Sequence, residues 1–426
     1  MSITRPIGFR AASTTAGIKP SGKPDLALIV RDEVAGALAA SAAVFTQNAM
    51  LGAPVTIGMA QRQMVLAGRQ PAHRAILINA GNSNAATGEK GLADAHACMI
   101  AVAERLGCGP SEVLPSSTGV IGRLLPVEKI VRAVPALVGA LDRGDAADAG
   151  AAGAIMTTDL VPKTAAREVE IAGRRVRLGA IAKGSGMIAP RLESAAGPMT
   201  PSATMLAFVT SDIAIRAGAL QDLLGRIARE TFNRISVDNH PSCSDTLVCL
   251  TSGAAGSEEG AAAMTPVALR SAEIEAFAGA LHGLCEDLSN QIVVDGEGAT
   301  RTFRIEVRGA PGDEAAEAMA REVVNSPLVK CAIHGRDPNW GRIVTAAGNA
   351  GVRFDPAQAS LRIGPVEVYR AGVPVMEALK DERLARAMSE QRVELVLSVG
   401  AGPGTAWMIG CDLSADYVRI NADYTT

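Results

Sequence analysis

The amino-acid sequence predicts a mixed α/β (α+β) protein. Apolar runs with β-branched character, typical of buried strands, alternate with longer stretches whose apolar residues recur at three-to-four spacing, typical of helices. The 426 residues are enough for two or three domains or for one large sandwich. No repeat of about 20 to 50 residues is visible, which excludes solenoids and propellers.

The individual elements follow from these patterns. Strands are expected at residues 27–31, 75–78, 205–210, 246–251, 302–307 and 393–399. Helices are expected at residues 94–106, 211–233, 265–292, 312–325 and 375–386. The centre of the alanine-rich and glycine-rich segment 139–154 is expected to be an exposed connection between helices, and segment 191–202, with two prolines, an exposed loop directly before a strand.

The composition excludes several classes of partner. The 41 basic and 44 acidic residues are spread along the chain without a run of like charge, which argues against nucleic-acid binding. No segment reaches the roughly 18 apolar residues that a membrane-spanning helix needs. The N-terminus lacks the apolar region of a secretory signal, so a cytoplasmic location is expected.

The seven cysteines are expected to be reduced thiols. Their number is odd, their spacing is wide and no C-x-x-C motif is present, so neither a disulfide framework nor a zinc ribbon is indicated. Cys331 and His334 have the spacing of a metal-ligand pair, but no second pair accompanies them, and small core or turn residues are the favoured interpretation. No metal and no prosthetic group are therefore expected.

Thr204 is the sharpest candidate for chemistry, because it lies where a proline-containing loop meets an apolar strand. A threonine hydroxyl is a weak nucleophile unless a base adjoins it. When threonine is the first residue of a chain, its own α-amino group, with a reference pKa of about 7.7 to 8.0, can be that base. Thr204 could reach this state only by cleavage of the Ala203–Thr204 bond; alternatively it is a structural residue that starts a strand.

Four small-residue segments are candidate turns around a ligand. The turn KGSGMIAP, which begins at Lys183, is either an anion site or a tight turn with a solvated lysine. Residues 115–122 could direct backbone amides at an oxyanion, or form an ordinary serine-rich turn. The carboxamide-rich segment 79–88 is a ligand loop or a plain turn, and the glycines of 400–404 are a weak match to a nucleotide turn.

The order of these motifs along the chain is much more specific than any single motif. The order INAGNSNAATG, SSTGVIG, AIMTTD, KGSGMIAP, ATMLAF, FNRISVD, DGEGATR, KCAIHGRDPNWGRI and a chain end NADYTT closely resembles the glutamate N-acetyltransferase (ornithine acetyltransferase) family of arginine biosynthesis. The resemblance runs from about Gly8 to Thr426 and so covers essentially the whole chain.

The resemblance implies a self-cleaving enzyme with the α-β-β-α sandwich of the N-terminal-nucleophile type. Cleavage between Ala203 and Thr204 would give an α chain of residues 1–203 and a β chain of residues 204–426, with a C-terminal α+β subdomain from about residue 300. The family also implies a cleaved αβ heterodimer that assembles to a heterotetramer.

The chemistry implied by the resemblance is ping-pong acyl transfer. The Thr204 hydroxyl would take the acetyl group of N-acetylornithine, and glutamate would then attack the acetyl-threonine ester. Thr118 and Gly119 match the family's oxyanion hole. The family's substrate-binding positions match Thr157, Lys183, Thr204, Glu297, Asn421 and Thr426. A cation at Lys183 and a carboxylate at Glu297 suit a substrate that carries both an ammonium and a carboxylate.

Other interpretations of these residues stay open. Glu297 could be a solvated turn acid, and Thr157 or Thr158 could cap a helix that follows Asp159. Trp340 is more often a packing anchor than a catalytic group. Acetyl-CoA is a candidate co-substrate, and the sequence alone does not distinguish a monofunctional from a bifunctional enzyme.

Two segments depart from the family pattern. About ten extra residues, 191–202, separate the KGSGMIAP turn from Thr204, and the family's VDGDTSTNDT segment is VDNHPSCSDT at residues 237–246. Two alternatives to acetyl transfer therefore remain: an amidohydrolase or aminopeptidase of the same fold group, in which water resolves the acyl-threonine, and a homologue that is not cleaved and only binds an amino acid or a partner.

Overall fold

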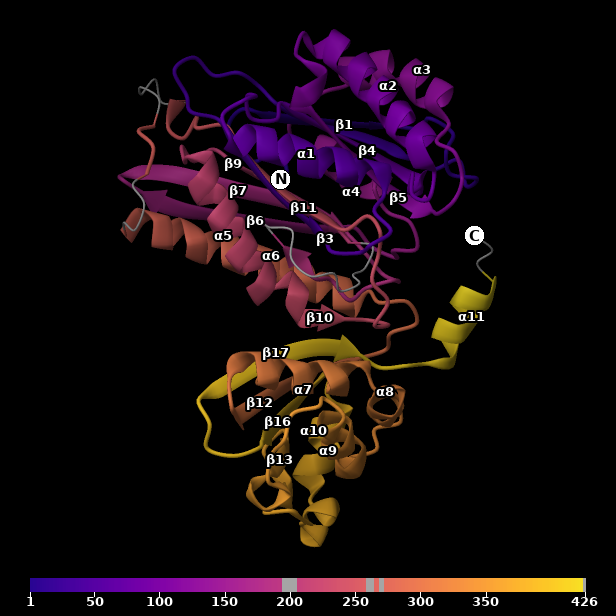
Figure 1. The fold of residues 1–426 in the computed structure, drawn as a ribbon, viewed down its shortest axis with the longest axis vertical. Helices are drawn as coiled ribbons and strands as arrows, with labels where there is room; N and C mark the ends of the chain where they lie inside the picture. Colours follow the sequence, from indigo (N-terminus) through magenta and orange to yellow (C-terminus); the bar gives the residue numbers. More distant parts are fainter. Residues whose placement is uncertain (194–204, 258–263, 268–271, 424–426) are drawn as a thin grey trace. The chain divides into compact units, whose positions relative to one another are not determined.

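The computed structural model describes the chain except for residues 194–204, 258–263, 268–271 and 424–426. Its described residues divide into two compact units, one of residues 1–233 with 240–292 and one of residues 234–239 with 293–423 (Figure 1). The expected break between Ala203 and Thr204 lies outside the described residues. It concerns a covalent cleavage and stays a prediction.

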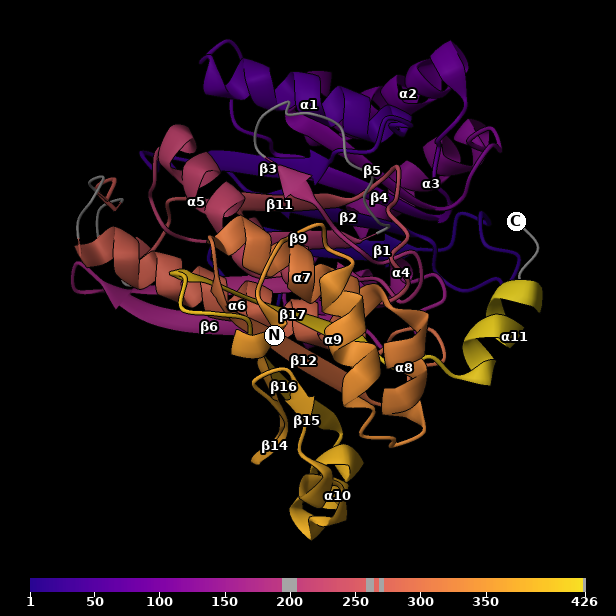
Figure 2. The same ribbon diagram turned by 60° about the horizontal axis from the view of Figure 1, so that its bottom comes forward.

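Two sheets form the first unit. The four-stranded sheet has the order β1 (Phe9–Thr14), β2 (Leu26–Arg31), β4 (Ala75–Asn82), β5 (Val113–Val120). The six-stranded sheet has the order β6 (Lys163–Ile171), β7 (Arg174–Lys183), β9 (Leu206–Ser211), β11 (Thr246–Thr251), β3 (Ala40–Thr46), β8 (Leu192–Glu193). Figure 2 shows β3, β11 and β9 side by side, with β9 and β11 parallel to each other.

The two sheets face each other across a shared core. Along β2, Leu28 packs with the helices α2 (Gly88–Leu106) and α3 (Val127–Gly139), whereas the next residue, Ile29, packs with Phe208 and Val248 of the other sheet. This alternation is the period-two pattern of a strand buried on both faces. The helices α5 (Ala217–Glu230) and α6 (Ala272–Val294) cover the outer face of the six-stranded sheet (Figure 1). The expected α-β-β-α sandwich is confirmed.

Two further helices pack at the margins of the sandwich. The helix α1 (Ala53–Leu66) lies against both sheets at Gly58, where a Cβ atom would come within 2.7 Å of the Phe45 ring. The helix α4 (Asp145–Ala154) buries Ala151 and Ala152 in the core between the sheets. The expectation of an exposed connection therefore holds only for the residues before α4, because α4 buries one face, with Asp148, Ala151, Ala152 and Ala154.

The second unit is built on one seven-stranded sheet. Its order is β10 (Ile235–Ser236), β17 (Gly404–Cys411), β12 (Thr302–Ala310), β16 (Arg392–Ser398), β13 (Ser360–Ile363), β14 (Val366–Arg370), β15 (Val373–Pro374). The helices are α7 (Asp313–Asn325), α8 (Pro327–His334), α9 (Trp340–Gly348), α10 (Glu382–Ser389) and α11 (Ala415–Asp423). Trp340 stacks on Tyr369 with ring centroids 5.3 Å apart, so it is the packing anchor that was expected.

Several expected boundaries were wrong for local reasons. The pattern at 211–233 contains the end of β9, and its helix begins only at Ala217. At 375–386 the chain forms a short 3-10 helix, and α10 starts after Asp381, whose side chain accepts the Arg383 N–H and caps the new helix. Of segment 191–202, which was expected to be an exposed loop, Leu192 and Glu193 form β8, with Leu192 buried, and residues 194–202 lie outside the described residues.

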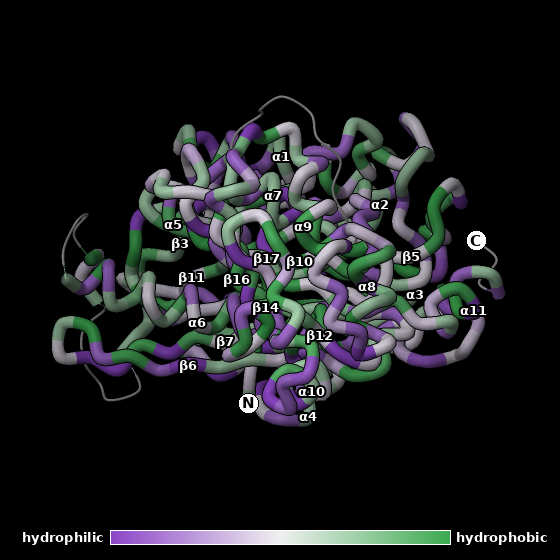
Figure 3. Tube along the Cα trace, turned by 90° about the horizontal axis from the view of Figure 1, so that it is seen from below, coloured by the Kyte–Doolittle hydropathy of each residue, from purple (hydrophilic) through white to green (hydrophobic). Residues whose placement is uncertain are grey.

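Strands that lack an apolar run escaped the sequence patterns. In β3 the sequence ASAAVFT has small residues of weak strand propensity, yet all seven are buried. In the β6–β7 hairpin, charged residues alternate with buried ones because one face of β6 is solvated, and its hydrophilic residues appear purple in Figure 3. Burial of these strands depends on their neighbours and not on their own hydrophobicity.

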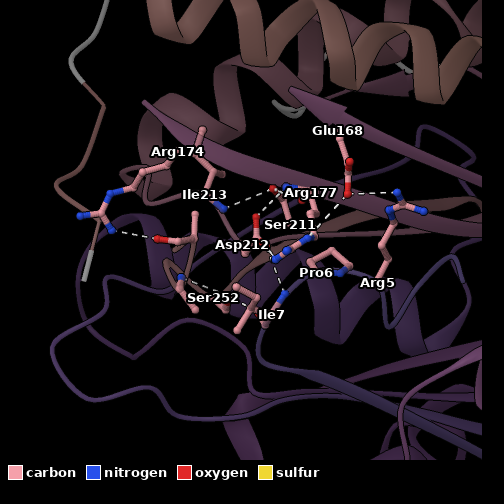
Figure 4. A network of polar contacts seen from close by, with 12 residues as sticks. Arg5, Pro6, Ile7, Glu168, Arg174, Arg177, Ser211, Asp212, Ile213 and Ser252 are labelled. Atoms are coloured by element: carbon pink, nitrogen blue, oxygen red, sulfur yellow. Dashed lines mark hydrogen bonds and ion pairs between the residues drawn. The ribbon is translucent and has the colours of Figure 1, made fainter. Parts of the chain in front are cut away.

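A buried carboxyl group ties the N-terminal segment to the six-stranded sheet. Asp212 accepts the backbone N–H of Arg177 at 2.7 Å and that of Ile7 at 3.1 Å, and the Arg177 guanidinium lies 3.6 Å away (Figure 4). Burial raises the pKa of Asp212 despite these contacts. An adjacent cavity of about 610 Å³, lined by Arg174, Arg177 and Glu168 among others, contains none of the predicted site residues.

The cysteines and the candidate metal pair have ordinary surroundings. All seven cysteines are free thiols, and burial raises the pKa of Cys249 to about 12. His334 pairs with Asp412, with Nδ1 and Oδ2 2.7 Å apart. Within the described ranges, no cluster of three or more His, Cys, Asp or Glu side chains could hold a metal ion. In the same ranges, no helix is both long enough and apolar enough to cross a bilayer.

Candidate active site

Lys183 joins the two sheets of the first unit. It is the last residue of β7, it pairs with Leu206 of β9, and its side chain is only 2 % exposed. Its Nζ donates to Thr118 Oγ1 at 3.4 Å, and Thr118 lies near the C-terminal end of strand β5 in the opposite sheet. The alternative of a tight turn with a solvated lysine is therefore wrong, since the ammonium group is inside the sandwich.

Thr118 and Gly119 lie near the end of β5, which runs to Val120 and pairs with β4, so most of the expected turn at 115–122 is strand. Ala80 and Gly81 are their partners, and the register shifts directly after Gly81. Gly119 has φ of +126°, and a Cβ atom there would lie 2.4 Å from the Gly81 carbonyl carbon. Only glycine fits such a position, which brings two backbone strands together at the point where an oxyanion hole was expected.

The Thr118 hydroxyl is oriented by its lysine neighbour. Because Lys183 has only N–H donors, the Thr118 oxygen is the acceptor of this hydrogen bond. The hydroxyl proton is then directed elsewhere and can be donated to a third group. This is the property that an oxyanion-hole hydroxyl needs.

The carboxamide side chains of segment 79–88 donate to nearby backbone carbonyls. Asn79 Nδ2 donates to Asn82 O at 2.8 Å, and Asn84 Nδ2 donates to Gly91 O at 2.8 Å. Asn82 Nδ2 donates to the carbonyls of residues 123 and 124, which closes the turn that follows Gly119. These amides hold Thr118 and Gly119 at the end of β5 in place, so the plain-turn interpretation describes them better than a ligand loop.

Thr157 lies in an irregular segment between α4 and β6, so no helix begins there and the helix-cap interpretation is wrong. Instead, the Thr157 N–H donates to Asp159 Oδ2 at 3.0 Å. The Asp159 side chain is fully buried. It also accepts the Gly184 N–H at 2.7 Å and pairs with Lys163 at 2.6 Å. Asp159 was not among the residues predicted from the sequence, because the i,i+4 spacing to Lys163 indicates an ion pair only on a helix, and no helix forms here.

Asp159, Lys163 and Lys183 form a cluster of charged groups in the protein interior. Burial alone would raise the pKa of Asp159, but the nearby charges of Lys183 and Lys163 outweigh it and hold that pKa well below its usual range. Both lysine side chains are almost fully buried. One carboxylate therefore serves two buried ammonium groups, and the carboxylate stays ionised.

Lys19, which was not predicted to be a site residue, is a third lysine near Asp159 and Lys183. Its Nζ donates to Pro24 O at 2.7 Å and to Ala154 O at 2.9 Å, at the end of α4. Burial lowers the pKa of Lys19 to about 8, and the charge of Lys183 contributes to the lowering.

The pKa of Lys19 predicts a pH-dependent contribution to stability. An unfolded lysine titrates near pH 10.4, so between about pH 8 and 10 the unfolded chain binds more protons, and the free energy of unfolding should rise with pH. Lys19→Met should reduce this rise, whereas Lys129→Met, which removes an exposed lysine bound to the same loop at Gly17 O, should keep it. Urea unfolding across this range measures both; identical slopes in the two variants would contradict the prediction.

The chain enters β9 through a buried residue directly after the predicted nucleophile. The Met205 N–H donates to Asp245 Oδ1, and Met205 O accepts the Thr246 N–H at 2.9 Å. Met205 thus lies at the same end of the β7–β9 pair as Lys183. Thr204 and Ala203 themselves lie outside the described residues.

Two predicted substrate residues meet in the second unit. Asn421 Nδ2 donates to Glu297 Oε2 at 2.8 Å, and Glu297 is 9 % exposed, so it is not a solvated turn acid. Beside them, burial and the Asp238 carboxylate raise the pKa of Tyr417. Thr426, the last predicted position, lies outside the described residues. The structure thus groups Thr118, Gly119, Thr157 and Lys183 in one unit and Glu297 with Asn421 in the other.

Comparisons with known proteins place the chain among well-defined relatives. The ArgJ family model matches residues 10–426. The arginine biosynthesis bifunctional protein ArgJ of Synechocystis is 44% identical, over 100% of this chain and 98% of its own. Crystal structures of ArgJ from Bacillus halodurans and of the ornithine acetyltransferase of Mycobacterium tuberculosis with ornithine are each 38% identical. They cover 50% and 45% of this chain, and 97% and 95% of their own, with TM-scores of 0.46 and 0.38.

Proposed function

The chain belongs to the ArgJ family, and on this premise we propose that it is an ornithine acetyltransferase that moves the acetyl group of N-acetylornithine to glutamate in arginine biosynthesis. The observation that carries the proposal is the contact between the buried Lys183 ammonium and Thr118, beside Gly119, at the strand ends where the chain enters β9. This arrangement suits a nucleophile that precedes Met205.

The first step that we propose is self-cleavage. The Thr204 hydroxyl attacks the Ala203 carbonyl, the C–N bond between the two residues breaks, and water hydrolyses the resulting ester. The products are a carboxylate at Ala203 and a free α-amino group on Thr204. That amine then serves as the base for the hydroxyl beside it.

Acetyl transfer follows the same chemistry twice. The Thr204 hydroxyl attacks the acetyl carbonyl of N-acetylornithine, the amide C–N bond breaks, and ornithine leaves with the proton that the α-amino group took from the hydroxyl. The amine of glutamate then attacks the acetyl ester, the C–O bond breaks, and the threonine hydroxyl regains its proton. Both tetrahedral intermediates carry an oxyanion, which the Thr118 hydroxyl and the Gly119 N–H would stabilise.

The remaining residues have proposed roles in binding. Lys183 supplies a cation for a substrate carboxylate, and Glu297 with Asn421 a carboxylate and an amide for a substrate ammonium. Thr157 and Thr426 complete the predicted set. Acetyl-CoA as a second acetyl donor, an αβ heterodimer that assembles to a heterotetramer, and a cytoplasmic location are further parts of this proposal.

Mass spectrometry of the purified protein tests cleavage and nucleophile together. We expect two fragments, residues 1–203 and 204–426, and we expect the second to gain the mass of one acetyl group after incubation with N-acetylornithine. Thr204→Ala should remain one chain of full mass and gain no acetyl group, because it has no hydroxyl to attack either carbonyl.

Three outcomes would overturn parts of this proposal. A fragment that begins at a residue other than Thr204 would contradict the site assignment. A wild-type chain that stays intact would favour a homologue that only binds its ligand. Acetate release in the absence of glutamate, at a rate equal to that of transfer in its presence, would favour an amidohydrolase.

A further inference from the structure

The Asp159 carboxylate binds four groups from three segments of the first unit. Oδ1 accepts from Lys163 Nζ at 2.6 Å and from the Gly184 N–H at 2.7 Å. Oδ2 accepts the Thr157 N–H at 3.0 Å and lies 3.8 Å from Lys183 Nζ. Contacts on both oxygens fix the plane and the position of the carboxylate, and the carboxylate in turn fixes the groups that surround it.

Two of these groups belong to the predicted site, and a third adjoins it. Thr157 and Lys183 are predicted substrate-binding residues, and Gly184, with φ of +155°, turns the chain directly after Lys183. From Lys183 the connection continues to Thr118 Oγ1 at 3.4 Å. Asp159 therefore contacts Thr157 and Lys183 directly and is connected to Thr118 through Lys183, although it was not predicted to be a site residue itself.

The two lysines contact the Asp159 carboxylate at different distances. Lys163 makes the short contact and has no exposed side-chain surface, which is the geometry of a structural ion pair. Lys183 makes the longer contact and reaches across to the opposite sheet. Lys163 thus balances the buried charge, while the attraction of Asp159 limits the positions that the Lys183 ammonium can take.

We propose that Asp159 is a positioning residue of the acetyl-transfer site, which sets the Lys183 ammonium and the Gly184 N–H relative to Thr118 and Gly119 at the end of β5. The inference rests on the proposed function. It assigns to Asp159 an effect on the reaction that is exerted through Lys183, beyond its contribution to folding.

Four variants test this inference on the full chain. Asp159→Asn keeps the shape and removes the charge. Lys183→Met removes the group through which Asp159 would act. The combination of Asp159→Asn with Lys183→Met measures their coupling. The combination of Asp159→Asn with Lys163→Met removes both members of the short ion pair, so that the Lys163 ammonium is not left buried without its carboxylate, and so serves as the control for folding.

We expect Asp159→Asn to lower kcat/KM for acetyl transfer, per cleaved molecule, by about 50-fold or more, a loss within the range of misplaced catalytic groups. In the Lys183→Met background, Asp159→Asn should lower kcat/KM by less than about threefold, because the ammonium group that Asp159 positions is already absent. With Lys163→Met, thermal stability should recover toward wild type while kcat/KM stays low. If a variant is not cleaved, the cleaved fraction replaces kcat/KM as the readout, with the same expected pattern.

Two results would overturn the inference. One is a loss of equal size in the wild-type and Lys183→Met backgrounds, which would mean that Asp159 does not act through Lys183. The other is recovery of activity together with stability in the variant that also carries Lys163→Met, which would mean a role in folding alone. Failure of the proposed function is distinct, because the wild-type protein would then transfer no acetyl group in the same assay.

Discussion

Gly119→Ala should disrupt the pairing of β5 with β4 at the predicted oxyanion hole. The new Cβ atom would lie 2.4 Å from the Gly81 carbonyl carbon and 2.6 Å from the Asn82 nitrogen, and alanine at φ of +126° is strained in any case. Backbone strain and overpacking together should lower the free energy of unfolding by about 3 to 5 kcal/mol. Any folded protein should also have lost acetyl transfer about 100-fold or more, because the oxyanion donors move apart.

Gly122→Ala is the matched control for this substitution. Gly122 lies three residues further along the chain and also has positive φ, at +79°, but nothing lies within 4 Å of its added Cβ. Gly122→Ala should lower the free energy of unfolding by about 1 kcal/mol, because only its backbone dihedral angle is strained, and it should leave acetyl transfer intact. Urea unfolding and initial rates measure both variants. Equal losses in the two would show that the contact with β4 is unimportant.

Thr118→Val should fold and yet transfer acetyl groups poorly. Valine keeps the branched shape at a fully buried position but has no hydroxyl to donate to an oxyanion. Removal of one such donor from an enzyme costs about 2.7 to 4 kcal/mol of transition-state stabilisation, so kcat should fall about 100-fold to 1,000-fold. Intact mass after incubation with N-acetylornithine, followed over time, would measure the slower formation of the acetyl-threonine fragment.

Thr118→Ser tests whether the hydroxyl is the cause. Serine retains the oxygen that accepts from Lys183 Nζ at 3.4 Å and the proton that can be donated, while it loses one methyl group. It should therefore keep kcat within about tenfold of wild type, the cost of a less constrained side chain. If serine and valine lower kcat equally, the contribution of position 118 is packing and not hydrogen bonding.

The order of the motifs allowed a set of candidate site residues to be predicted before the fold was known. Thr118, Gly119, Thr157 and Lys183 come from three segments far apart in the chain, and all four lie in the first unit. Lys183 and Thr118 are in direct contact, as a shared site requires. Asp159 and Lys19 were not predicted, because a single acid or a single lysine in a turn has no pattern that separates a buried charge from a solvated one.

The sequence by itself determined the family, the mixed α/β class and the chemistry proposed for Thr204, because these depend on residue types and their order. Only the tertiary structure decided which polar residues are buried together. It placed Lys183 inside the sandwich, made Asp159 the shared partner of two lysines, and turned the carboxamides of 79–88 toward nearby backbone carbonyls. The physical reason is that burial and pairing of a charge depend on which strands face each other, and this is set by long-range packing that no local pattern records.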